Sequence, residues 1–114
     1  MSILDNAKSH FTELVNGDGM RSIDVPEWGE SIYFKPMMAM NGMQYQKYFE
    51  AASKSDYDGM VDLLILRSRY EDGRKMFKPS DKKELMMSVS PDVVTSVVGR
   101  MAEADNSSEE AVKK

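Results

Sequence analysis

The chain has 114 residues, of which 41% are hydrophobic and 30% are charged, and its formal net charge at pH 7 is −4. This length and balance predict one folded domain and exclude a chain that is disordered throughout. The acidic excess argues against nucleic acid as the main partner. Because the chain has no cysteine, disulfides, thiolate metal sites and thiol nucleophiles are excluded. No apolar run is long enough to span a bilayer and no signal-peptide pattern opens the chain, so a membrane is not expected as a partner either.

Residues 3–15 have the pattern of an amphipathic helix. Ser2 is a suitable N-cap, and the turn-rich segment 16–19 ends the helix. His10, the single histidine of the chain, lies beside the apolar face and has no second histidine or cysteine to join it, so we interpret it as structural. The helix either docks on the body or swings away from it. The apolar residues at helical spacing are Leu4, Ala7, Phe11, Leu14 and Val15.

Two short segments after this helix alternate apolar and polar residues with a period of two, which predicts a β-hairpin. Pro26 ends the first strand, and Trp28 lies in the connecting turn. A tryptophan in a turn either folds back onto the sheet or marks a contact surface. The apolar positions of the two strands are Ile23, Val25, Ile32 and Phe34.

The next element is a helix that begins with a clear capping signal. Asn41 is a good N-cap, and Gln44 three residues later completes a capping box. The residues that follow form an aromatic stripe, which we expect to pack against another apolar surface. The stripe consists of Tyr45, Tyr48, Phe49 and Ala52.

A second helix is predicted to begin at the Ser55–Asp58 capping signal, and it is apolar on most sides. Leu63 and Leu66 lie off its main face, so the helix is either central or half of an interface. We predict self-association through these two leucines, and hence a homo-oligomer. An alternative is a hairpin in which 64–70 and 74–77 pair around Asp72-Gly73. The main face consists of Tyr57, Met60, Val61, Leu64 and Ile65.

Two further helices complete the predicted domain. Ser80 caps a short helix with Leu85, Met86 and Val89 inward, and Ser90-Pro91 marks the start of the last helix. The buried stripe of the last helix consists of Val93, Val94, Val97, Val98 and Met101. From Asp105 onward apolar residues nearly vanish, so we predict one globular domain over 1–104 and a disordered tail over 105–114. The predicted fold class is α+β, a small and mainly helical domain with an N-terminal β-hairpin.

Neither the acidic nor the basic clusters point to catalysis, so we expect a protein that is not an enzyme and that holds no cofactor or metal. The acidic cluster Asp56, Asp58 and Asp62 lacks calcium-loop spacing, and two of its members lie where the first turn of a helix normally carries acids. The one basic patch is interpreted as a solvated face. It consists of Arg67, Arg69, Arg74 and Lys75.

Methionine is the unusual component, at 11 of 114 residues. Flexible thioether side chains suit either an irregular core or an adaptable surface that holds varied apolar segments. Met37, Met38 and Met40 cannot all point inward in one regular element. We therefore predict a protein-binding surface, which consists of Trp28, Met37, Met38, Met40 and Met43.

The order of these features resembles the tail assembly chaperones of long-tailed (siphovirus-type) bacteriophages. The resemblance runs from Ile23 to Glu103 and depends on the order of four segments rather than on any single motif. The methionine content and the helix at 3–15 depart from the family pattern. The four segments are DVPEWGESIYFKPM, YQKYFEAA, MVDLLILRSRYEDGRKMF and SPDVVTSVVGRMAEAD.

This resemblance implies a protein that binds the tape measure protein in the host cytoplasm, keeps its apolar surface from aggregating and helps to recruit tail tube subunits. Such chaperones often have a longer product, made by ribosomal frameshifting, that engages the tail tube protein. Lys113-Lys114 is either the trace of such a recoding site or simply a charged terminus. The alternatives are a structural head–tail connector of the virion and a small regulatory protein.

Overall fold

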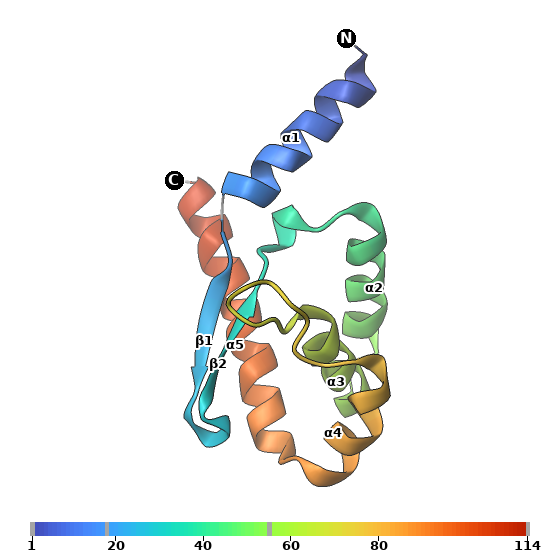
Figure 1. Cartoon of the computed structure of the whole chain (residues 1–114), viewed down its shortest axis with the longest axis vertical. Coiled ribbons are helices and arrows are strands. Elements are labelled where there is room, and N and C mark those ends of the chain that lie inside the picture. The colour runs from blue at the N-terminus through green and yellow to red at the C-terminus, as the bar shows by residue number, and fades with distance from the viewer. Residues whose placement is uncertain (1, 18, 55, 114) are drawn as a thin grey trace.

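A β-hairpin lies along one side of a helical body in the computed structural model (Figure 1), which describes residues 2–17, 19–54 and 56–113, without the side chains of 106–113. Strand β1 (Arg21–Val25) pairs antiparallel with β2 (Glu30–Phe34), and Ile23 lies opposite Ile32. Alternate residues of both strands face the core, as the period of two predicts. The turn is a 3-10 helix, η1 (Pro26–Trp28), and Gly29 follows it at a φ of 66°, a conformation that favours glycine. The predicted hairpin and the α+β fold class are confirmed.

Helix α3 (Tyr57–Arg67) lies at the centre of the body. It packs against α2 (Gly42–Ser53), α4 (Lys82–Ser88) and α5 (Pro91–Lys113), while α5 also contacts β1. The short 3-10 helices η2 (Met37–Ala39) and η3 (Pro79–Asp81) precede α2 and α4. The buried core comes from the hairpin, α3, α4 and α5, and consists of Ile23, Val25, Ile32, Phe34, Val61, Leu64, Ile65, Leu85, Val94, Val97 and Met101.

Local capping signals set the starts of the helices. Asn41 Oδ1 accepts from the backbone N–H of Gln44, whose side chain accepts from the backbone N–H of Asn41, each at 2.9 Å, so the predicted capping box is confirmed. Helix α3 is capped by Asp56, which accepts from the N–H of Gly59 at 2.9 Å. Ser55, where the sequence signal was placed, lies outside the described residues. Helix α5 begins at Pro91, as predicted.

The segment after α3 combines the two predictions made for it. Helix α3 ends at Arg67, and the chain then turns back on itself around Gly73, with the Tyr70 N–H donating to the Arg74 carbonyl at 2.9 Å. Arg69 also exchanges two backbone hydrogen bonds with Tyr33 of β2, at 2.7 and 2.9 Å. The hairpin around Asp72-Gly73 therefore exists, but it begins after Arg67 and adds a short bridge to β2.

The aromatic stripe of α2 packs against the body only in part. Tyr45 is 48% exposed, Phe49 is 61% exposed, and Tyr48 is half-buried. Of the residues of α2, only Ala51 is buried. Tyr48 is the member of the stripe that faces the body, since it lines a small pocket with Leu63 of α3 and its ring centroid lies 5.5 Å from the guanidinium carbon of Arg67. Similarly, Met86 of α4 was expected inward and is 39% exposed, whereas Leu85 is buried as predicted.

Helix α1 (Ile3–Gly17) projects from one end of the body (Figure 1). It contacts η2, and Phe11, Leu14 and Val15 are partly buried, whereas its first half, including His10, is exposed. Of the two arrangements that the sequence allows, the structure has the helix that swings away. It gives the molecule extents of 52 × 27 × 26 Å.

Helix α5 passes the boundary at residue 104 where the sequence predicts a disordered tail. The helix spans Pro91–Lys113, and the side chain of Asp105 is buried. The tail prediction is therefore wrong for Asp105, because this residue continues the buried face of α5 four positions after Met101.

Candidate functional site

Arg67 is a buried arginine at the end of α3 that joins four elements. Its Nη1 donates to Asp105 Oδ2 of α5 at 2.7 Å, and its Nη2 donates to the backbone carbonyl of Lys35 at 2.8 Å and to Asp105 Oδ1 at 3.3 Å. The guanidinium carbon lies 5.0 Å from the ring centroid of Phe34 and 5.5 Å from that of Tyr48. A buried charge is tolerated only when it is paired and hydrogen-bonded, and this arrangement supplies both.

This environment corrects the sequence interpretation of Arg67 as part of a solvated basic face. Only 5% of Arg67 is exposed. The partner that makes burial favourable is Asp105, 38 residues later, and no local pattern around Arg67 indicates it. The one available signal is the spacing of Asp105 after Met101 on the apolar face of α5.

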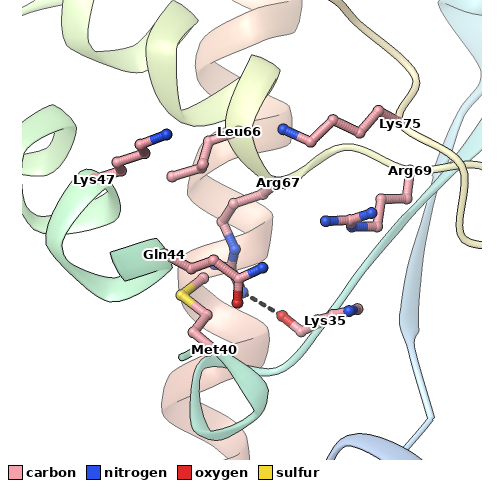
Figure 2. Close-up of a pocket in the computed structure, with 8 residues that line it drawn as sticks. All are labelled: Lys35, Met40, Gln44, Lys47, Leu66, Arg67, Arg69 and Lys75. Atoms are coloured by element: carbon pink, nitrogen blue, oxygen red, sulfur yellow. Dashed lines mark hydrogen bonds between the residues drawn. The ribbon is translucent and has the colours of Figure 1, made fainter. Parts of the chain in front are cut away.

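A basic pocket of about 220 Å³ opens in front of Arg67, between α2, the end of β2 and the segment after α3 (Figure 2). Five of its eight lining residues are cationic, and none is acidic. Figure 2 shows the ammonium groups of Lys47 and Lys75 approaching each other from opposite sides of Leu66. The lining residues are Lys35, Met40, Gln44, Lys47, Leu66, Arg67, Arg69 and Lys75.

The lysines of this basic pocket form no ion pair in the part of the chain that the structure describes. Within the described residues, no carboxylate lies within salt-bridge distance of Lys35, Lys47 or Lys75. Arg69 is held in place differently, since its Nη1 donates to the carbonyl of Gly73 at 2.9 Å. Sequence reasoning grouped Arg69 and Lys75 in a basic patch but missed Lys35, Gln44 and Lys47, because the fold brings them from β2 and α2.

A second cluster of charges shows the opposite arrangement, in which acids and lysines alternate. Lys54 contacts Asp58 and Asp62 at 3.0 and 2.6 Å, and Lys82 contacts both at 2.9 Å. Hydrogen bonds from Lys82 and Lys54 hold the pKa of Asp58 below its usual value. Partial burial opposes this effect at Asp62, but the same two lysines still lower its pKa. Bonds to Asp62 and Asp58 in turn raise the pKa of Lys54.

The acidic cluster predicted from the sequence is therefore divided between two structural roles. Asp56 caps α3, while Asp58 and Asp62 form ion pairs with lysines. Among the described residues, no group of three or more histidine, cysteine, aspartate or glutamate side chains is arranged to hold a metal ion.

Three of the predicted binding methionines come together in a pocket of about 420 Å³, here called the methionine pocket. It is lined by Arg21, Pro36, Met37, Met38, Met40, Tyr45 and Asp105. Met38 is 41% exposed, and Met43, in the first turn of α2, is 74% exposed. Phe49 stacks on Tyr45 with ring centroids 6.5 Å apart, so it extends the apolar surface along α2. Met40 lines both the methionine pocket and the basic pocket.

The structure does not bring Trp28 into this surface. The hairpin turn that carries Trp28 and the η2 helix that carries Met37 and Met38 lie at opposite ends of β2 (Figure 1). A five-residue strand separates its ends by about 17 Å. Trp28 packs instead against the core, edge to face with Phe77 at 6.4 Å between ring centroids. Of the two roles left open for it, folding back is the one observed.

Leu63 and Leu66, the residues predicted for self-association, are both half-buried. Leu63 lines a small pocket with Tyr48 of α2 and with Val98 and Met101 of α5, and Leu66 lines the basic pocket. Both leucines therefore face neighbouring elements of their own chain, as expected for a central helix. Self-association through them stays a prediction.

Comparisons of the chain with protein-family models, with curated proteins and with solved structures find no match. Within the described residues, no helix is both long enough and apolar enough to cross a membrane. The resemblance to phage tail assembly chaperones stays a prediction.

Proposed function

We propose that this protein is a tail assembly chaperone of a long-tailed phage, which binds an apolar segment of the tape measure protein without catalysing a reaction. The observation that supports this proposal most directly is the exposed apolar surface formed by the methionine pocket and the adjoining aromatic side chains of α2. Met38, Met43, Tyr45 and Phe49 are all more than a third exposed. Large apolar side chains gathered on a surface mark a binding site more often than isolated ones do.

The chemistry of this surface fits a client that is not rigidly defined. Thioether side chains repack at low cost, and stacked aromatic rings offer a broad apolar contact. The exposed apolar start of α1, with Ile3 and Leu4, adds a second element able to contact the same client. In this proposal the protein acts in the host cytoplasm, and a longer frameshifted product recruits the tail tube protein.

Co-purification with the tape measure protein of the same phage tests the proposal. Met38→Glu places a charge on the wall of the methionine pocket, and we expect it to reduce recovery of the tape measure protein at least fivefold. Met86→Glu is the matched control, because Met86 is similarly exposed, at 39% against 41% for Met38, but lies on α4 and does not line the methionine pocket. Equal recovery with both variants contradicts the proposed surface, and no recovery with the unmodified protein contradicts the function.

The second candidate is a structural head–tail connector of the virion, which would also need an apolar contact surface. Mass spectrometry of purified particles separates the two functions. A chaperone is absent from finished particles, whereas a connector is present at a fixed ratio to the tail proteins.

A further inference from the structure

The basic pocket concentrates positive charge in a protein whose net charge is −4. Lys54 and Lys82, elsewhere in the structure, are each paired with two aspartates. Lys47 and Lys75 have no such partner among the described residues, although both approach the same space from opposite sides (Figure 2). Arg67 is paired with Asp105, whereas the three pocket lysines, Lys35, Lys47 and Lys75, form no ion pair among the described residues. Like charges held together without counterions raise the free energy of the protein, so these lysines mark a place where an anion binds favourably.

The back of the basic pocket is rigid. Arg67 is buried and held by three hydrogen bonds, and its Nε, also buried, has no hydrogen-bond partner within the described residues. Arg69 is fixed by its bond to the carbonyl of Gly73. Because these two side chains are already positioned, an incoming anion does not have to order them, which favours binding.

The remaining lining side chains indicate which kind of anion fits. Leu66 and Met40 make part of the wall apolar, and Met40 continues into the methionine pocket. A bare phosphate would contact only the cations and gain nothing from these two residues. A carboxylate on an aliphatic side chain uses both, because its methylene groups lie on the apolar wall while its oxygens meet the cations.

We propose that the basic pocket binds a glutamate or aspartate side chain of a partner protein, whose apolar neighbours lie in the methionine pocket. The proposed binding of an acidic side chain depends on the proposed function only for the identity of the partner protein. The pair of adjoining pockets then selects an acidic residue next to apolar ones, rather than any apolar segment.

The test uses two short, fluorescently labelled peptides with blocked ends, one of leucine and glutamate and one in which glutamine replaces each glutamate. Anisotropy titrations of the full chain should show tighter binding of the glutamate peptide. An exposed ion pair contributes up to about fivefold in affinity, so we expect a preference of about five- to twentyfold when two lysines act together. Added salt should reduce this preference.

Lys47→Gln combined with Lys75→Gln should abolish the preference, and both residues are exposed enough to be replaced without disturbing the core. The matched control is Lys8→Gln combined with Lys83→Gln, which removes the same charge from exposed positions outside the pocket. Equal binding of the two peptides, or loss of the preference in the control, overturns the proposal.

Competition separates a carboxylate ligand from a phosphate ligand. N-acetylglutamate should displace the glutamate peptide at lower concentration than inorganic phosphate does, and the reverse order overturns the choice of ligand. The peptide titration needs no phage protein, so its result is independent of the co-purification. If the peptides show no preference for glutamate while the tape measure protein still co-purifies, only the assignment of the basic pocket is overturned. Peptide selectivity without tape measure binding overturns only the proposed function.

Discussion

Arg67 of α3 and Asp105 of α5 form an ion pair 2.7 Å long in which both side chains are less than a tenth exposed. The pair fixes α5 against α3 at the point where the hairpin ends, because the Lys35 carbonyl accepts from the same guanidinium. Asp105 also lines the methionine pocket. The same interaction therefore stabilises the fold and shapes the proposed binding surface.

Asp105→Asn should be strongly destabilising, because it leaves the Arg67 charge buried without its counterion. Breaking one side of a buried pair costs about 3–5 kcal/mol, and urea unfolding followed by circular dichroism measures this loss. Glu103→Gln, on an exposed part of the same helix, should change the unfolding free energy by less than about 0.5 kcal/mol. A loss below about 1 kcal/mol for Asp105→Asn would contradict a buried pair.

Gly59 and Gly99 should respond in opposite directions to alanine. A Cβ at Gly59 would lie 2.5 Å from the Ala51 carbonyl oxygen and 2.9 Å from Lys54 Cβ, so α2 and α3 would have to separate. We expect Gly59→Ala to destabilise the protein by about 1–3 kcal/mol. A Cβ at Gly99 meets nothing within 4 Å, so Gly99→Ala should stabilise α5 by about 0.5–1 kcal/mol. Thermal unfolding distinguishes the two, and equal effects would refute the close approach at Gly59.

Acid should destabilise the protein partly through Asp58 and Asp62. Their pKa values are lowered in the folded state, so the unfolded state binds more protons near its own carboxyl pKa of about 3.9. The two ionised aspartates therefore contribute fully to the free energy of unfolding above that pH. Their contribution is lost as the pH falls through the lower pKa values of the folded state. The urea midpoint should fall between pH 6 and pH 3, and it should fall less steeply in the double variant Asp58→Asn with Asp62→Asn than in the unmodified protein. An unchanged slope would argue against the bridges to Lys54 and Lys82.

Trp28→Ala should weaken the fold and leave client binding intact. Because Trp28 is half-buried against Phe77, we expect a loss of about 1–3 kcal/mol, below the value for a fully buried aromatic residue. Tyr45→Ala, which removes an exposed ring, should cost less than about 0.5 kcal/mol and reduce tape measure binding instead. The opposite pattern would place Trp28 at the contact surface after all.

The sequence predicts well those features that depend on interactions between near neighbours. The capping box of Asn41 and Gln44 acts across three residues, and the Pro91 start signal acts within one turn, so both can be identified without a fold. The hairpin is equally local, because its period of two fixes which side chains face the core. These signals were sufficient for the fold class.

The site depends on contacts that local patterns do not encode. Lys47 and Lys75 line one pocket only because the fold places α2 and the segment after α3 on either side of Leu66. The stripe of Tyr45 and Phe49 shows a further limit, since helical periodicity identifies an apolar face but not whether the protein itself covers it. The structure brings Met37, Met38 and Met40 together in one pocket, while their role in binding stays a prediction. Placing Trp28 required knowledge of which end of the hairpin faces η2.

Helix α5 follows the hairpin and α3 in chain order, and this has a consequence for the order in which the protein can fold during synthesis. This helix supplies Val94, Val97 and Met101 to the core, and Arg100 donates to the carbonyl of Asp24, 76 residues earlier. A ribosome makes the hairpin and α3 first, so their apolar faces stay uncovered until α5 emerges. The nascent chain is thus prone to aggregation for a short time, and the synthesis of α5 ends that state.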